Sequence, residues 1–367
     1  MDSKKYIHFS DLQYERLRET YRQWWAGGLE RPIVPIVTCG HKTSFQATRA
    51  PLLEFSTAWN FSIDPRQFIE AHTYELSKQR FHGEAFPGFY TQSFGPGVMA
   101  SFLGCIPQQA KDTVWFLPSK EVPIDQLHFE YDENNPYLRR VMNTIEAAQD
   151  AWHGQVVVGM PDLGGIMDVL ASFRGSENLI LDLYDDPDEV VRCVKELQEL
   201  WFLYYNKFID ILRPEAKGYS QWFDVYGEEP GYILQSDFSY MISPDMFRRF
   251  VGWELSSSAK RLANTLYHMD GVGEIPHLDQ LLAMDGIKAI QWQPGEGTAA
   301  LQNWDDLLKR ILASGKKLLS WNQKPDGSPV DYAAPGQLFL ATRYYPVEQW
   351  DDAKKYGSMY GIDIDLD

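Results

Sequence analysis

The chain has 367 residues, and its 34 basic residues against 51 acidic residues give a formal net charge of −17. This charge disfavours nucleic acid and anionic membranes as partners. The three cysteines are too few and too scattered for a disulfide framework, which favours a reducing compartment. We find no secretion signal and no run near the roughly 20 apolar residues of a membrane span, so we expect a soluble, cytoplasmic protein.

The first predicted element is an amphipathic helix from Asp11 to Trp25. Ser10 and Asp11 are suited to cap its start, and Gly27-Gly28 marks its end. We assign residues 1–30 to an N-terminal helical extension and residues 31–367 to one following domain. The segment 33–38 then reads as a short buried strand that opens into a loop at Cys39-Gly40-His41.

Short apolar runs that end at a polar or glycine-containing turn recur along the chain. They occupy 33–38, 85–90, 155–160, 218–223, 263–267, 287–292, 317–321 and 337–341. Segments with helical periodicity lie between most of them, at 65–80, 136–152, 187–212, 244–262, 277–284, 304–313 and 347–356. Eight strands alternating with helices predict an α/β fold, specifically a (β/α)8 TIM barrel. An open doubly wound sheet is the alternative, but no G-x-G-x-x-G follows the first strand.

Functional residues in such a barrel lie at the carboxyl ends of the strands. Polar residues and tryptophans are frequent at these ends, which indicates a small-molecule pocket at one mouth of the barrel. Each of these residues could instead serve a turn or the core. The candidates for substrate binding are Thr38, Gln92, Asp162, Trp222, Gln291, Trp292 and Asn322.

The candidate catalytic residues are His268, Asp270 and Asp237. His268 and Asp270 lie two residues apart at the end of a predicted strand, so their side chains point to the same face. Asp237, after a long loop, can bring a second carboxylate to the same mouth. One histidine and two carboxylates suit a divalent metal with open positions, or a protonated acid beside a charged partner. The alternative is a structural histidine and two turn or cap residues.

Seven motifs follow one another in the chain. They are Phe94-Gly95-Pro96-Gly97 with Leu103-Gly104, Gly159-Met160-Pro161-Asp162-Leu163-Gly164-Gly165, Arg174-Gly175 with Glu177-Asn178-Leu179, Leu183-Tyr184-Asp185-Asp186-Pro187, Ile242-Ser243-Pro244-Asp245-Met246-Phe247, His268-Met269-Asp270-Gly271 and Ile290-Gln291-Trp292-Gln293-Pro294-Gly295. In these motifs and their order the chain resembles the uroporphyrinogen decarboxylase-like superfamily, which includes cobalamin-dependent methyltransferases. The resemblance covers the chain from about Ala85 onward.

The chain lacks two motifs of this superfamily, and their absence narrows the expected substrate and the expected metal ligands. The decarboxylases carry an arginine-rich loop after the first strand, whereas this chain has Thr38-Cys39-Gly40-His41, so uroporphyrinogen is not the expected substrate. The methyltransferases bind zinc through an H-x-C-G motif and a late cysteine. His268 matches that motif, but Asp270 replaces the first cysteine, and Leu340-Ala341-Thr342-Arg343 lacks the second. A His/Asp/Asp set holds a harder metal, or holds zinc more weakly.

The resemblance therefore implies a methyltransferase that moves a methyl group from a small methylated compound to a corrinoid protein. Its implied cofactors are a divalent metal such as zinc and a corrinoid carried on a partner protein. Its expected partners are the small-molecule substrate and that corrinoid protein, with a homodimer also allowed. The alternatives are a lyase acting on another carboxylated metabolite, or a barrel that binds a small molecule without catalysis.

Overall fold

The computed structural model describes residues 5–212, 217–295, 304–320 and 333–364. Its strands are β1 (Pro35–Cys39), β2 (Gln79–Gly83), β3 (Gly88–Phe89), β4 (Ile106–Gln109), β5 (Val114–Leu117), β6 (Val157–Val158), β7 (Tyr219–Ser220), β8 (Tyr226–Gly227), β9 (Gly231–Gln235), β10 (Ala263–Asp270), β11 (Ile287–Gln293), β12 (Lys317–Ser320), β13 (Leu338–Leu340) and β14 (Arg343–Pro346).

The helices of the described residues include all seven helical segments that the sequence predicts, with small shifts at their ends. They are α1 (Asp11–Ala26), α2 (Pro65–Ser77), α3 (Met99–Phe102), α4 (Pro136–Trp152), α5 (Ile166–Arg174), α6 (Ser176–Asp185), α7 (Pro187–Leu212), α8 (Pro244–Met246), α9 (Trp253–Arg261), α10 (Leu278–Leu282), α11 (Asp305–Ala313) and α12 (Trp350–Ser358). A π-helical segment, Phe247–Gly252, joins α8 to α9.

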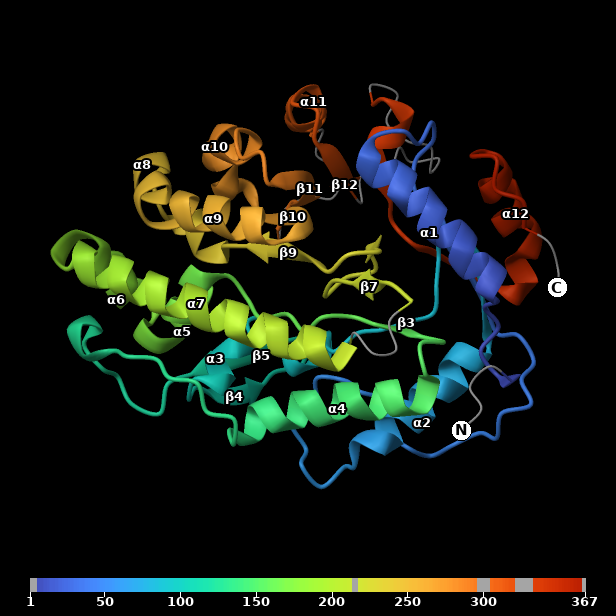
Figure 1. Cartoon of the computed structure of the whole chain (residues 1–367), viewed down its shortest axis with the longest axis horizontal. Helices are drawn as coiled ribbons and strands as arrows, with labels where there is room; N and C mark the ends of the chain where they lie inside the picture. The colour runs from blue at the N-terminus through green and yellow to red at the C-terminus, as the bar shows by residue number, and fades with distance from the viewer. Residues whose placement is uncertain (1–4, 213–216, 296–303, 321–332, 365–367) are drawn as a thin grey trace.

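The largest sheet is parallel and has the strand order β13-β12-β11-β10-β9. Every residue of β9 and most residues of β11 are buried, and half of the residues of β10 are buried and the others partly buried, as expected for strands covered on both faces. Helices α9, α10 and α11 lie on one side of these strands, and the long helices α4 and α7 lie on the other (Figure 1). This sheet places the ends of β9, β10 and β11 side by side.

The closed eight-stranded barrel is not confirmed. Across the described residues the strands form separate sheets, and β1 shows why. Its two edges are occupied by β14, which is parallel to it, and β2, which is antiparallel to it. A strand has only two edges for hydrogen bonding, so β1 cannot also pair along its length with β3 or β13. Only Ile33, before β1, forms a bridge to Phe339 of β13. A mixed α/β fold is what the structure shows.

The fourth strand of the predicted series is also reassigned. The segment 218–223 forms only the short β7, which pairs with β8 in an antiparallel hairpin. The neighbour of β10 is β9, from the stretch that the sequence analysis treated as a loop. Asp237 therefore follows directly after a buried parallel strand.

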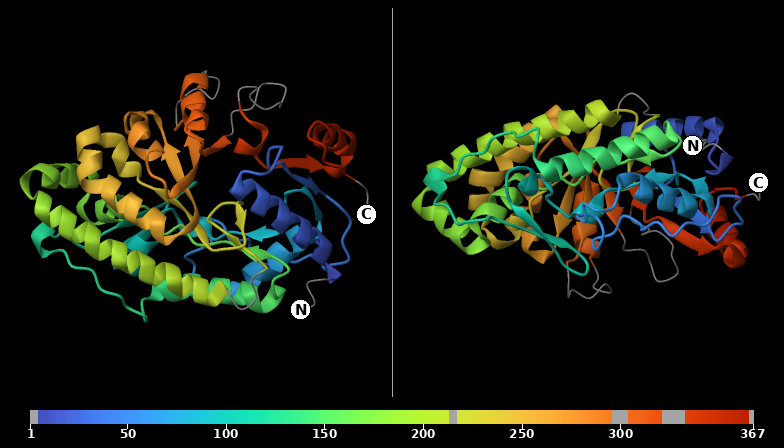
Figure 2. Two further views of the ribbon diagram at one scale, coloured as in Figure 1. Left: turned by 45° about the horizontal axis from the view of Figure 1, so that its top comes forward. Right: turned by 90° about the horizontal axis from the view of Figure 1, so that it is seen from below.

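Helix α1 forms as predicted. Ser10 and Gln13 make a capping box at its start, and Gly27 ends it in the left-handed conformation with a φ of 79°. Trp24 is fully buried, and its ring meets Phe339 of β13 at a centroid distance of 5.9 Å. Both views in Figure 2 place α1 and α12 at the same end of the molecule. The buried side chains of α1 belong to the same core cluster as those of the rest of the protein. The separate extension over 1–30 stays a prediction.

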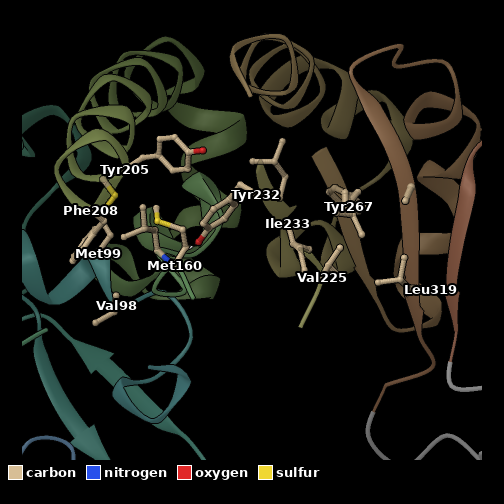
Figure 3. Packing of buried hydrophobic residues seen from close by; sticks show 14 of the residues in the cluster. Val98, Met99, Met160, Tyr205, Phe208, Val225, Tyr232, Ile233, Tyr267 and Leu319 are labelled. Carbon is tan, nitrogen blue, oxygen red and sulfur yellow. Dashed lines mark hydrogen bonds between the residues drawn. The ribbon is translucent and has the colours of Figure 1, made fainter. Parts of the chain in front are cut away.

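Buried side chains from the large sheet and from the helices around it form one cluster. Tyr232 of β9 points toward Met160 (Figure 3), and its hydroxyl donates a hydrogen bond to the carbonyl of Pro161 and accepts one from the N–H of Leu163. Tyr267 of β10 is likewise fully buried. These contacts hold β9 and β10 firmly behind the residues at their carboxyl ends.

Candidate functional site

Asp237, His268 and Asp270 come together at the carboxyl edge of the large sheet. One ligand atom from each lies within 4.8 Å of the other two. His268 Nε2 is 3.8 Å from Asp270 Oδ2, and these side chains are 15% and 37% exposed. The three residues line up on neighbouring strands because His268 and Asp270 end β10, while Asp237 follows β9, which pairs with β10.

Gln291 fixes the orientation of the His268 ring. The two residues are register partners on β10 and β11, and His268 Nδ1 donates a hydrogen bond to Gln291 Oε1. Nδ1 therefore carries a hydrogen, and Nε2 is the nitrogen on the side of Asp270. A second partner that fixes the tautomer in this way is typical of a metal-binding histidine.

The charges around His268 favour its protonated form in the absence of a metal. Burial alone lowers the pKa of His268, but the interaction with Asp270, 3.8 Å away, and the charge of Asp237 outweigh it and raise the pKa to about 9. The surroundings of Asp237 shield its carboxylate from water, which raises its pKa to about 6, whereas the charge of His268 lowers it. Part of the Asp237 side chain is still exposed to solvent. These groups therefore favour a positive charge between them, either on the His268 imidazolium or on a metal ion.

Two carboxylates that the sequence analysis missed hold the site from behind. Asp168 of α5 accepts hydrogen bonds from the backbone N–H groups of Asp237 and Phe238, at 3.1 and 2.7 Å. Glu274 is fully buried and accepts from the N–H of Asp270 at 3.0 Å and from the Tyr267 hydroxyl at 2.7 Å. In the sequence, both resemble ordinary acidic residues of a first helical turn, so no pattern distinguished them.

Burial dominates the electrostatics of these two supporting groups. It raises the pKa of Asp168 to about 7, with a further rise from the nearby charge of Asp237, while the hydrogen bonds from Phe238 and Asp237 oppose it. Burial also raises the pKa of Glu274 well above its usual range. Burial therefore favours the protonated form of both supporting carboxyl groups, and this form repels the acidic groups in front of them less.

Two hollows meet at Asp237. A recess of about 290 Å³ is lined by Asp237, Tyr240, Asp270, Gly271, Val272, Pro294 and Gly295. A larger groove of about 870 Å³ runs from Asp168 and Asp237 along α5 and α6 to the β4–β5 hairpin. The recess gives a small ligand access to the carboxylates of Asp237 and Asp270.

Three of the predicted substrate-binding residues lie around His268. Gln291 bonds it, and the Trp222 ring meets the imidazole edge-on with centroids 5.5 Å apart. Asp162 is buried, which raises its pKa to about 6, while the charge of His268 opposes that rise. Gln92 reaches the same area indirectly, because its amide donates to the carbonyl of Trp222.

Of the remaining three predicted residues, two are described, and both lie away from His268. Thr38 is buried in β1, where its hydroxyl is hydrogen bonded to His41 Nε2 at 2.8 Å and to His82 Nε2 at 3.1 Å. Trp292 is fully buried, and its ring packs against Trp304 at 5.1 Å, so contact with a substrate would require these side chains to move. Asn322 lies outside the described residues.

The comparisons with known proteins support the fold and leave the family open. No protein-family profile matches the chain, and no curated protein matches it. Among solved structures, a methyltransferase from Methanosarcina mazei aligns with a TM-score of 0.53 and 15% identity, over 90% of this chain and 93% of that chain. The two chains share a fold. Within the described residues, no helix is both long enough and apolar enough to cross a bilayer.

Proposed function

We propose that the protein is a methyltransferase that moves a methyl group from a small methylated compound to the cobalt of a corrinoid protein. The observation that carries this proposal is the geometry of Asp237, His268 and Asp270 at one sheet edge, with Gln291 fixing the imidazole. The resemblance to the uroporphyrinogen decarboxylase-like superfamily and the fold shared with a methyltransferase both support it.

The donor groups fit a divalent metal such as zinc. Nδ1 of His268 is engaged by Gln291, so Nε2 is the ring nitrogen left to coordinate, and Asp237 and Asp270 supply oxygen ligands. A metal held there would act as a Lewis acid on the atom that carries the methyl group. Two carboxylates also offset the charge of a divalent ion. Metal binding must displace a proton from Nε2, so affinity rises with pH.

The reaction breaks one bond and forms another. Transfer to a corrinoid partner would form a carbon–cobalt bond with an electron pair from cobalt(I), while the bond between the methyl carbon and the donor atom would break and leave its electrons on that atom. That atom then takes up a proton. If no metal is bound, His268 can supply this proton from Nε2, because its imidazolium is stabilised by Asp237 and Asp270.

The test uses the purified chain with cob(I)alamin as methyl acceptor and a panel of methylated alcohols, amines and thioethers. Methyl transfer converts cobalt(I) to methylcobalt(III), which changes the visible spectrum. We expect His268→Ala and Asp270→Ala to abolish transfer while thermal unfolding stays nearly unchanged, because strand-end residues contribute little to the core. His128→Ala is the matched control, because His128 is 65% exposed and pairs with Glu196 of α7.

Metal analysis of the same samples separates the two forms of the proposal. Zinc in the wild type and its loss in His268→Ala support metal-assisted transfer. Activity without any metal supports His268 as a proton donor. Full activity in both site variants, or loss of substrate without methylation of cobalt, would reject the proposal, and the second result would favour the lyase alternative.

A further inference from the structure

A third cavity is separate from the two hollows at Asp237, and none of Asp237, His268 and Asp270 lines it. Its volume is about 360 Å³, within the roughly 300–1,000 Å³ range of ligand pockets. Gln92, Asp224 and Thr342 line it, and they follow β3, β7 and β13 respectively. We call it the Asp224 cavity.

The walls of the Asp224 cavity are mainly aromatic and aliphatic. The aromatic side chains are Phe81, Phe86, Tyr90, Phe223 and Tyr344. Val37, Leu76 and Pro35 add aliphatic surface. Tyr344 is 63% exposed, so this wall also reaches the outside of the molecule.

Three carboxylates line the cavity, and two of them already have cationic partners. Glu84 is bonded by Arg31 at 2.6 Å, and Glu75 is paired with Lys78 at 2.8 Å. Asp224 differs, because its described partner is a neutral group: the Thr342 hydroxyl donates to Oδ2. Asp224 Oδ1 is buried and has no hydrogen-bond partner among the described residues.

No lysine or arginine is among the described residues that line the cavity. His72 does not replace one, because burial lowers its pKa to about 4 despite the nearby charge of Glu75, and its Nε2 accepts a hydrogen bond from the N–H of Leu53. The Asp224 cavity thus combines aromatic walls with a carboxylate that has no cationic partner among the described residues.

We propose that the Asp224 cavity binds a small organic cation with an alkylated ammonium group. A buried carboxylate without a counter-ion is unfavourable, and a cation among aromatic rings gains from their negative faces. An inorganic ion fits less well, because calcium and magnesium require six or more oxygen ligands, and the aromatic walls do not supply them. The inference does not depend on the metal site.

Calorimetric titration with choline tests this proposal on the full chain. The uncharged isostere 3,3-dimethylbutan-1-ol has the same shape, so it isolates the effect of charge. We expect choline to bind at least about tenfold more tightly than the alcohol, and Asp224→Asn to remove most of this difference. Glu75→Gln is the matched control, because Lys78 already pairs with that carboxylate, and it should change choline affinity less than about twofold.

Two further variants keep the outcome decisive. Tyr344→Leu removes an exposed ring and should fold even if Asp224→Asn does not, and we expect it to weaken choline binding by about 3- to 10-fold. His268→Ala should bind choline like the wild type, which separates this cavity from the proposed methyl-transfer site. Absence of choline binding, equal binding of the alcohol, or wild-type affinity in both Asp224→Asn and Tyr344→Leu would overturn the inference.

Discussion

His268 and Gln291 face each other as register partners across β10 and β11, and the hydrogen bond between them determines which imidazole nitrogen points at the acidic groups. The ring could otherwise rotate or change tautomer. Because β10 and β11 are central strands of a buried parallel sheet, this relationship is set by backbone pairing.

Replacing Gln291 should therefore weaken the metal binding that we propose, without removing a ligand. We expect Gln291→Met to lower zinc affinity by about 10- to 100-fold, as loss of a supporting hydrogen bond to a metal-binding histidine does. Gln291→Glu keeps an acceptor and should retain affinity within a few fold. Competition with a chromogenic chelator measures both. Wild-type affinity in Gln291→Met would show that this bond does not support metal binding.

Asp168 should matter for stability as well as for the site. Asp168→Ala leaves the backbone N–H groups of Asp237 and Phe238 without their acceptor, so we expect a loss of about 1–3 kcal/mol in the free energy of unfolding. Urea denaturation measures this loss. Asp150→Ala, at an exposed position of α4, is the control and should change stability by less than about 0.5 kcal/mol. Equal effects of the two variants would contradict the assigned role of Asp168.

The buried carboxyl group of Glu254 should make the free energy of unfolding depend on pH. Burial raises the pKa of Glu254 to about 7 from its usual 4.5, although hydrogen bonds from Ser258 and Gln198 oppose the rise. The folded protein thus keeps a proton that the unfolded chain releases. The stabilisation is complete below pH 4.5 and is lost as the pH rises toward 7, by about 3 kcal/mol in total.

Glu254→Gln removes this titration, so its unfolding free energy should fall less between pH 5 and pH 7.5 than that of the wild type. Denaturation curves at the two pH values provide the comparison. Glu133→Gln, at an exposed position, should leave the wild-type dependence intact. An unchanged dependence in Glu254→Gln would mean that other buried carboxylates account for it.

We also predict that uroporphyrinogen is not decarboxylated. The four residues Cys39-Gly40-His41-Lys42 at the end of β1 include no arginine, and the Thr38 hydroxyl is hydrogen bonded to His41 and His82. Arginine forks are the usual binding groups for carboxylate substrates, and these four residues supply none. Incubation followed by chromatography of the porphyrins decides the matter, and coproporphyrinogen formed at enzymatic rates would refute the prediction.

The sequence by itself determined most elements and part of the site. Alternating apolar runs predicted strands at all eight positions, and helical periodicity predicted helices such as α4 and α7 at their observed bounds. The two-residue spacing of His268 and Asp270 placed both on one strand face, because side chains alternate along a strand. These are local properties, fixed by neighbours along the chain.

Strand pairing and the partners of the site were decided only by the tertiary structure. Pairing is a competition for two edges, so β2 and β14 could take both sides of β1, and β9 rather than 218–223 could pair with β10, without any local signal. Asp168 accepts a hydrogen bond from the backbone of Asp237, which is far away in sequence, and Glu274 accepts one from the backbone of Asp270 across a turn. Trp292 packs inside the protein against Trp304. Such contacts depend on three-dimensional proximity, which residue spacing does not encode.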